Sequence, residues 1–418
     1  MSLSSLKDRL AGAKSYAVSF GEVVKINATV ITAQGLNVSI SDMVKIVSNE
    51  TNKDIVGMVT EIDGKTFFIT PFSFVEGFAS GDKVFLDSTG MNIPVGDSLL
   101  GRVVDPFMRP IDGKGTIKDS KLSPIIKAPI AAMKRGMIDE IFSVGVKSID
   151  GLLTCGKGQK LGIFAGSGVG KSTLMGMIVR GADTPIKVVA LIGERGREVP
   201  EFIEKNLGGD LTNTVIIVAT SDDSPLMRKY GAFAAMSVAE FFKDKGLDVL
   251  FIMDSVTRFA MAQREIGLAL GEPPTSKGYP PSSLTLLPQL MERAGKEDPI
   301  ADQSRSILDG HIVLSREMTD FGIYPPVHIL NSASRVMNDI ISEEHFKAVM
   351  KFRRLYTLLK ENETLIRIGA YTKGSDAELD EAIDKKIKMA EFISQGAMYQ
   401  EDFDTSSNTL INLMQINS

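Results

Sequence analysis

One glycine-rich segment carries the residue types that hold a phosphate chain. It reads AGSGVGKS from Ala165 to Ser172, after the apolar run Leu161–Phe164 and before a helical pattern at residues 173–180. Such glycines let backbone N–H groups turn toward phosphates at a helix N-terminus. We predict an ATP site in which Lys171 reaches the β- and γ-phosphates and the Ser172 hydroxyl ligates Mg²⁺.

The nucleotide-contacting residues predicted from this segment continue into the first turn of the helix. They are Gly166, Ser167, Gly168, Val169, Gly170, Lys171, Ser172 and Thr173. A glycine-rich turn that binds nothing is the alternative, and the strand before the segment and the helix after it both speak against that alternative.

Two carboxylates follow other apolar runs. Asp254 closes the run at residues 249–253, and Glu194 lies just past the run at residues 188–192. Because the carboxyl ends of parallel strands converge on one crevice, we expect both near the phosphates. Asp254 would join the Mg²⁺ shell through water, and Glu194 would act as the catalytic base that orients the attacking water. Glu198 is the other local candidate for the base, and a solvated charged turn is the alternative for residues 193–198.

The elements that must position these residues form an alternating pattern between residues 98 and 343. Apolar runs of strand length are separated by helical stretches, which is typical of a parallel α/β sheet. The predicted strands are Lys160–Ala165, Lys187–Ile192, Thr214–Thr220, Asp248–Asp254 and His311–Ser315. After residue 344 the chain is helix-patterned and rich in charge, with Gly369, Gly374 and Gly396 as breaks.

The first part of the chain has the pattern of a small closed β domain. Alternation from Val24 to Val30 predicts one half-buried strand, with Val24, Ile26, Ala28 and Val30 on one face. Asp63-Gly64 lies between two short β-rich runs and predicts a hairpin.

Composition excludes several classes of protein. At 418 residues the chain exceeds a single core, and 43% hydrophobic with 24% charged residues is ordinary for a globular protein. No twenty-residue apolar run or signal peptide is visible, so we expect a cytosolic protein. Cys155 is the single cysteine, the three histidines lack metal-ligand spacing, and the net charge of −5 favours no nucleic acid partner.

These motifs resemble the rotary-type hexameric ATPases over nearly the whole chain. The matching segments are Gly162–Ser172, Gly193–Glu198, Asp254–Arg258, Gly271–Pro274, Lys277–Ser282, Gly101–Asp105 and Pro110–Gly113. Within that group, the chain most resembles the flagellar type III export ATPases, and the related injectisome ATPases are the near alternative. The segments that favour the flagellar group are Pro288–Gly295, Gly369–Tyr371, Lys373–Asp376 and Ala382-Ile383.

The resemblance implies a fold of class α/β with a central RecA-like P-loop domain, an N-terminal β-barrel and a C-terminal helical domain. The implied boundaries are a short N-terminal segment at 1–15, the barrel at 16–86, the ATPase domain at 87–343 and the helical domain at 344–418. It also implies that Arg335 is an arginine finger offered to the neighbouring subunit, that Tyr324 packs near adenine, and that Arg195 contacts the nucleotide. From the sequence alone, Arg335 could be a surface ion pair and Tyr324 a core aromatic.

Further expectations concern partners. The resemblance implies a homohexameric ring at the inner face of the bacterial membrane, with a stator-like regulator, a coiled-coil stalk protein, export-gate membrane proteins and export chaperone–substrate complexes. Members usually carry a longer amphipathic segment before the barrel, which engages the regulator; about fifteen residues precede it here. The resemblance therefore leaves regulator binding through that segment open for this chain, which could be trimmed there.

Two rival classes differ at particular residues. A non-catalytic ring subunit would lack a carboxylate at Glu194. An RNA translocase of the termination-factor type would need a basic N-terminal domain with a stacking platform, whereas the first eighty-five residues are not basic and their aromatics cluster between Phe67 and Phe78.

Overall fold

The computed structural model describes residues 19–128, 136–275, 278–293 and 308–415. The predicted N-terminal segment at residues 1–15 lies outside the described residues. So do Lys277 and the last two residues of the motif at residues 288–295. The chain divides into two compact units, of which the first centres on residues 1–92 and the second holds most of the remainder.

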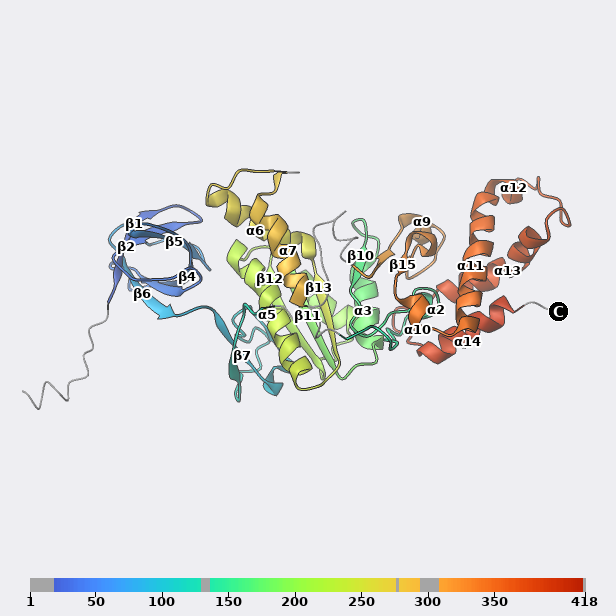
Figure 1. Ribbon diagram of the computed structural model, residues 1–418, viewed down its shortest axis with the longest axis horizontal. Helices are drawn as coiled ribbons and strands as arrows, with labels where there is room; N and C mark the ends of the chain where they lie inside the picture. Colours follow the sequence, from blue (N-terminus) through green and yellow to red (C-terminus); the bar gives the residue numbers. More distant parts are fainter. Residues whose placement is uncertain (1–18, 129–135, 276–277, 294–307, 416–418) are drawn as a thin grey trace, which may run out of the picture. The chain divides into compact units, whose positions relative to one another are not determined.

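A closed six-stranded barrel forms the body of the first unit (Figure 1). Its strand order is β1-β2-β5-β4-β3-β6, and β6 pairs back onto β1. The strands are β1 (Gly21–Ile26), β2 (Ile31–Gln34), β3 (Met43–Val47), β4 (Asp54–Asp63), β5 (Thr66–Pro71) and β6 (Lys83–Ser88). Aliphatic side chains and Phe67 fill the interior, so the predicted barrel is confirmed.

The prediction of one strand from Val24 to Val30 is wrong. The chain turns between β1 and β2, where the Asn27 N–H donates to the Val30 carbonyl at 2.9 Å. An irregularity between Val23 and Lys25 also shifts the alternation, so Val23 is buried whereas Val24 is 45% exposed. The alternation of apolar and polar residues continues through a tight turn. Periodicity alone therefore does not show that the chain reverses direction there.

The hairpin predicted at Asp63-Gly64 is confirmed. Asp63 of β4 faces Thr66 of β5 across the turn, and Gly64 has a φ of 59°. That left-handed backbone is one that glycine adopts at little cost.

Two sheets form the scaffold of the second unit. One has the order β13-β11-β12-β8, all parallel, and the other has the order β10-β14-β15. Their strands are β8 (Val103–Val104), β10 (Leu161–Phe164), β11 (Ile186–Glu194), β12 (Thr214–Thr220), β13 (Val249–Asp254), β14 (Gly310–Val313) and β15 (Ala333–Ser334). All five strands predicted for this region are present, which confirms the parallel α/β class.

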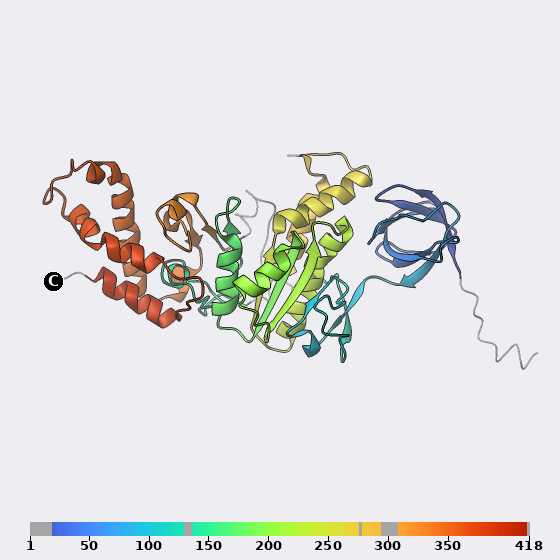
Figure 2. The ribbon, with the colours of Figure 1, turned by 180° about the vertical axis from the view of Figure 1, so that it is seen from behind.

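Helices cover both faces of the four-stranded sheet (Figures 1 and 2). Val189 and Leu191 of β11 pack toward α3 (Lys171–Gly181) and the adjoining α4 (Glu198–Glu201) and η3 (Phe202–Asn206). Ile192, on the opposite face, approaches Gly231 of α5 (Pro225–Asp244). Burial on both faces explains why these strands read as continuous apolar runs.

The described residues contain further elements, most of which belong to this unit. They are β7 (Asn92–Val95), η1 (Asp97–Leu99), β9 (Lys121–Pro124), α2 (Lys147–Leu152), α6 (Val256–Ala269), α7 (Pro281–Arg293), α9 (Arg316–Asp320), η5 (Ile329–Asn331) and α10 (Met337–Ile340).

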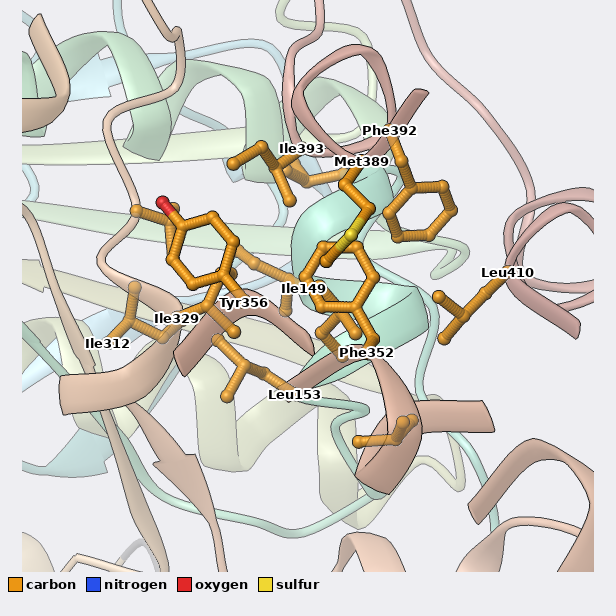
Figure 3. Packing of buried hydrophobic residues seen from close by; sticks show 14 of the residues in the cluster. Ile149, Leu153, Ile312, Ile329, Phe352, Tyr356, Met389, Phe392, Ile393 and Leu410 are labelled. Carbon is orange, nitrogen blue, oxygen red and sulfur yellow. The ribbon is translucent and has the colours of Figure 1, made fainter. Parts of the chain in front are cut away.

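The C-terminal part is helical, as predicted. Its helices are α11 (Glu343–Glu361), α12 (Glu363–Arg367), α13 (Ala377–Ile393) and α14 (Phe403–Met414). Figure 3 shows Phe352, Met389, Phe392 and Leu410 from these helices packed with Ile149 of α2. The helical part and the nucleotide-domain elements around α2 therefore share one hydrophobic core. No helix among the described residues is long and apolar enough to cross a membrane.

Candidate functional site

The glycine-rich segment forms the connection between β10 and α3. Gly168 and Gly170 have φ values of 74° and 100°, a backbone region that a side chain makes costly, and Lys171 begins the helix. Residues 166–168, Ser172 and Thr173 are exposed, whereas Val169 is buried against the core. The loop therefore presents its backbone and the helix N-terminus outward, which is the arrangement that receives phosphate groups.

Lys171 and Asp254 form an ion pair at the mouth of this loop. The Lys171 Nζ donates to Asp254 Oδ1. Asp254 ends β13 and is only 4% exposed, so its carboxylate is buried beside Lys171. The structure thus places together two residues that are 83 positions apart in the sequence.

Glu194 ends β11, the neighbour of β13. In the parallel register Leu191 lies opposite Asp254, so Glu194 stands three residues farther along the same sheet edge. Burial raises the pKa of the Glu194 carboxyl above its usual range, Asp254 and Glu198 raise that pKa further, and Lys171 acts in the opposite direction. A partly buried carboxyl with a raised pKa beside a phosphate loop is suited to proton transfer.

Glu198 and Arg195 lie next to Glu194 and pair with each other, and the Glu198 carboxyl also interacts with that of Glu194. Arg195 Nη1 and Glu198 Oε1 are 3.3 Å apart, and the arginine side chain is largely exposed whereas the glutamate side chain is about a third exposed. Gly193 permits this end of β11 to approach α6, since a Cβ there would lie 2.7 Å from the Cβ of Arg258. Glu194 is partly buried, whereas Arg195 is exposed to solvent.

Tyr324 lies on the segment that runs beside the phosphate loop. Pro326, two residues on, would lie 3.9 Å from a Cβ built on Gly170, and its carbonyl accepts from the Ser315 N–H at 3.0 Å. The Tyr324 side chain is 55% exposed, so the alternative of a core aromatic is wrong.

Arg335 lies at the other end of the strands that carry the loop. Its N–H donates to the Asp309 carbonyl at 2.8 Å, and Asp309 in turn donates to the carbonyl of Lys160, just before β10. The phosphate loop follows the carboxyl end of β10. Arg335, with an exposed side chain, is thus not brought together with Lys171, Asp254 and Glu194 of its own chain.

Sequence reasoning missed two residues that contact the predicted site. Arg316 Nη2 donates to the Ser167 carbonyl at 3.2 Å and so ties α9 to the phosphate loop. Gln395 donates through its backbone N–H to the Tyr324 carbonyl at 2.6 Å. Arg316 follows a predicted strand end, which is a weak signal, and nothing in the sequence around Gln395 indicates its contact.

The oxygen donors beside the phosphate loop fit Mg²⁺. The exposed Ser172 hydroxyl and the Asp254 carboxylate are hard ligands of the kind that this cation takes. Within the described parts of the chain, no group of three or more His, Cys, Asp or Glu side chains could hold a metal ion. Mg²⁺ commonly completes its shell with water and phosphate oxygens, so two protein ligands are enough.

Fold and crevice together define a P-loop ATPase, and comparison with known proteins places it more narrowly. The nucleotide-binding domain of the ATP synthase alpha/beta family matches residues 145–298 and 296–334, and the T3SS EscN ATPase C-terminal domain matches residues 341–412. The chain is 63% identical over 435 aligned residues to a flagellum-specific ATP synthase of Helicobacter pylori, covering 99% of this chain and 100% of that protein. It is 44% identical to the Bacillus subtilis counterpart, covering 95% of each.

Solved structures agree with this placement. The assembled ATPase EscN of the enteropathogenic E. coli type III secretion system aligns with a TM-score of 0.87 at 40% identity, covering 94% of this chain and 100% of that one. EscN in complex with its central stalk EscO aligns with a TM-score of 0.89 at the same identity and coverage. The chain belongs to the flagellum-specific ATP synthase family, the export ATPases of the flagellum, and it hydrolyses ATP.

Proposed function

We propose that this ATPase works as a homohexameric ring with Mg·ATP bound between subunits, and that hydrolysis drives the unfolding, chaperone release or entry of flagellar export substrates. The observation that carries this proposal is the Lys171–Asp254 pair next to the phosphate loop, with the partly buried Glu194 on the neighbouring strand. Arg335 lies on the side of the strands away from the phosphate loop, which supports a site completed by a neighbour.

In the proposed site, the phosphate loop holds the triphosphate. Backbone N–H groups of Gly166–Gly170 and the N-terminus of α3 face the phosphates, and Thr173 and Arg195 add contacts at the edges. Lys171 exchanges Asp254 for the β- and γ-phosphate oxygens when ATP enters. That exchange leaves the Asp254 carboxylate available to the magnesium shell.

Ser172 and, through water, Asp254 would hold Mg²⁺. Bound there, the cation would neutralise charge on the β- and γ-phosphates. Glu194 would orient the attacking water and accept its proton, for which its raised pKa is suited. Tyr324 would pack beside the adenine, because its exposed ring lies two residues from the proline that borders the loop.

A finger from the neighbouring subunit is the last part of the proposal. Arg335 would approach the γ-phosphate of the adjacent site and stabilise charge in the transition state, an effect worth about 10³–10⁵ in rate in nucleotide hydrolases. Hydrolysis would then depend on assembly.

The proposed partners follow the family. We expect a coiled-coil stalk protein, a stator-like regulator, export-gate membrane proteins and chaperone–substrate complexes, at the cytoplasmic face of the membrane. The assembled EscN ring and its complex with the stalk EscO support the first of these by analogy. We also propose domain boundaries near residues 86 and 343. The first falls within β6, the last barrel strand, which runs on to Ser88, and the second falls at the start of α11.

The experiment that tests the site compares Lys171→Ala, Glu194→Gln and Glu198→Gln for ATP binding and turnover. Lys171→Ala should lose both, because it removes the charge that holds the phosphates. Glu194→Gln should keep ATP bound and lose hydrolysis by about 10²-fold or more. Glu198→Gln is the matched control and should remain active. Normal turnover in Glu194→Gln, with loss in Glu198→Gln, would move the catalytic base to Glu198.

A further inference from the structure

Gln395 is a buried polar side chain at the end of α13, where the helical part meets the nucleotide domain. Gln395 is only 6% exposed, yet both polar atoms of its side-chain amide have hydrogen-bond partners. Oε1 accepts from the Lys147 N–H at 2.8 Å, and Nε2 donates to the carbonyls of Gly145 and Tyr399, each at 2.8 Å. Three hydrogen bonds therefore fix this amide in one orientation.

The turn that holds Gln395 is itself anchored. The Asp150 carboxylate accepts from the N–H groups of Val144 and Gly145, each at 2.9 Å. Gly145, at a φ of 72°, packs so closely that a Cβ there would lie 2.6 Å from the Cα of Gly181, the last residue of α3. Since α3 begins at the phosphate loop, Gln395 is linked through Gly145 to the far end of the helix that carries Lys171.

The backbone of the same residue holds Tyr324. The Gln395 N–H donates to the Tyr324 carbonyl at 2.6 Å. The segment from Tyr324 to Pro326 in turn borders Gly170 of the phosphate loop. Gln395 thus contacts two parts of the nucleotide domain. Its side chain bonds Gly145, which packs against α3, and its backbone N–H bonds Tyr324.

We propose that Gln395 is a positioning residue for the base end of the nucleotide, which it controls by holding Tyr324 at a set place beside the phosphate loop. This inference rests on the proposed role of Tyr324 toward adenine. Losing the side-chain amide leaves the backbone bond from Gln395 to Tyr324 in place but removes the three bonds that fix Gln395 to Lys147, Gly145 and Tyr399. The Tyr324 segment is then tied to a turn whose position is no longer fixed. The phosphate loop keeps its own contacts, so the base end of the site is affected and the phosphate end is not.

The test is a pair of binding measurements on the full chain. Gln395→Met keeps the side-chain volume and removes all three side-chain hydrogen bonds. We expect the Kd for Mg·ATP to rise by about five- to tenfold. The Kd for Mg·tripolyphosphate, which has phosphates and no base, should stay within about twofold, because the phosphate end is untouched. The value of kcat should also stay within about twofold, because Gln395 is not at the reacting atoms.

His345→Leu is the matched control. His345, also buried between the helical part and α2, bonds the Gly151 carbonyl through Nε2 at 2.7 Å and packs against Phe403, rather than bonding the Tyr324 carbonyl as Gln395 does. The His345→Leu variant should have a lower melting temperature and unchanged Kd values for Mg·ATP and Mg·tripolyphosphate. Should Gln395→Met fail to fold, Gln395→Glu, which keeps the acceptor for Lys147 and loses both donors, serves in its place.

Three results would overturn the inference. One is an unchanged Kd for Mg·ATP in the Gln395 variant, and another is an equal rise for Mg·ATP and Mg·tripolyphosphate. The third is a normal Kd for Mg·ATP in Tyr324→Ala, which would remove the proposed adenine contact itself. Weakened binding in Tyr324→Ala with normal binding in Gln395→Met would overturn only the role of Gln395.

Discussion

Lys171 and Asp254 are paired with each other where the nucleotide should bind. The lysine is about a third exposed and the aspartate is almost fully buried, so the lysine is the partner that can move. A phosphate chain that enters the loop must take Lys171 from Asp254. The pair therefore competes with nucleotide until a cation is present to occupy the carboxylate.

Removing that competition gives a first prediction. Asp254→Asn should bind ATP in EDTA several-fold more tightly than the unchanged protein, because the phosphates no longer compete with a carboxylate for Lys171. The same variant should gain little when Mg²⁺ is added and should hydrolyse ATP poorly. Calorimetric titration with and without Mg²⁺ measures both effects, and weaker binding of Mg²⁺-free ATP would contradict the competition.

A second prediction concerns pH. The raised pKa of Glu194 means that the ionised form needed by a base is reached at higher pH than for an ordinary glutamate. As pH falls, kcat/KM should therefore decline above the usual glutamate range, which centres near about 4.3. Glu198→Gln removes one of the carboxyls that raise this pKa, so the decline should move to lower pH. A pH profile of both proteins checks the sign, and a shift to higher pH would count against Glu194 as the titrating base.

Stability provides a third prediction. Gly145→Ala should destabilise the protein by about 2–4 kcal/mol, because the new methyl overlaps Gly181 and the backbone has a φ of 72°. Gly158→Ala is the control, since Gly158 has a φ of 83° and nothing within 4 Å of a Cβ. That change should cost only about 1–2 kcal/mol. Chemical denaturation measures both, and equal losses would mean that the close approach to α3 contributes nothing.

Much of the fold could be predicted because the central strands are buried on both faces. Burial makes each strand a continuous apolar run, and polar residues at the strand ends then mark the crevice, as Asp254 and Glu194 do. The barrel strands were harder to predict, since they are short and their buried and exposed residues alternate. A turn at Asn27–Val30 ends one strand, but the alternation of apolar and polar residues continues through it, so the sequence pattern does not reveal the turn.

Contacts across long stretches of chain could not be predicted. Gln395 and Gly145 are 250 positions apart, and Arg316 and Ser167 are 149 apart. Each contact is made by a common residue type on an otherwise unremarkable helix or helix end. Only the packing of α13 and α9 against the nucleotide domain brings these side chains to the loop and its helix.

If hydrolysis occurs between subunits with Arg335 supplied by the neighbour, a single Arg335 variant should show a particular defect. Arg335→Ala should bind ATP almost normally and hydrolyse it about 10³-fold or more slowly, because a finger acts on transition-state charge. Ring formation by this variant, measured by light scattering, should be intact. A failure to assemble would instead assign Arg335 to the interface itself.

The most direct measurement is the ATPase rate of mixtures of Arg335→Ala and Glu194→Gln subunits at ring-forming concentration. In a mixed ring, an Arg335→Ala subunit keeps its own Glu194 and receives the finger of a Glu194→Gln neighbour, so one competent site is restored at each such junction. We predict that mixtures hydrolyse ATP well above either variant alone, with the rate greatest near equal proportions. Mixtures as inactive as their parents, in rings shown to contain both subunits, would contradict catalysis by a neighbour's Arg335.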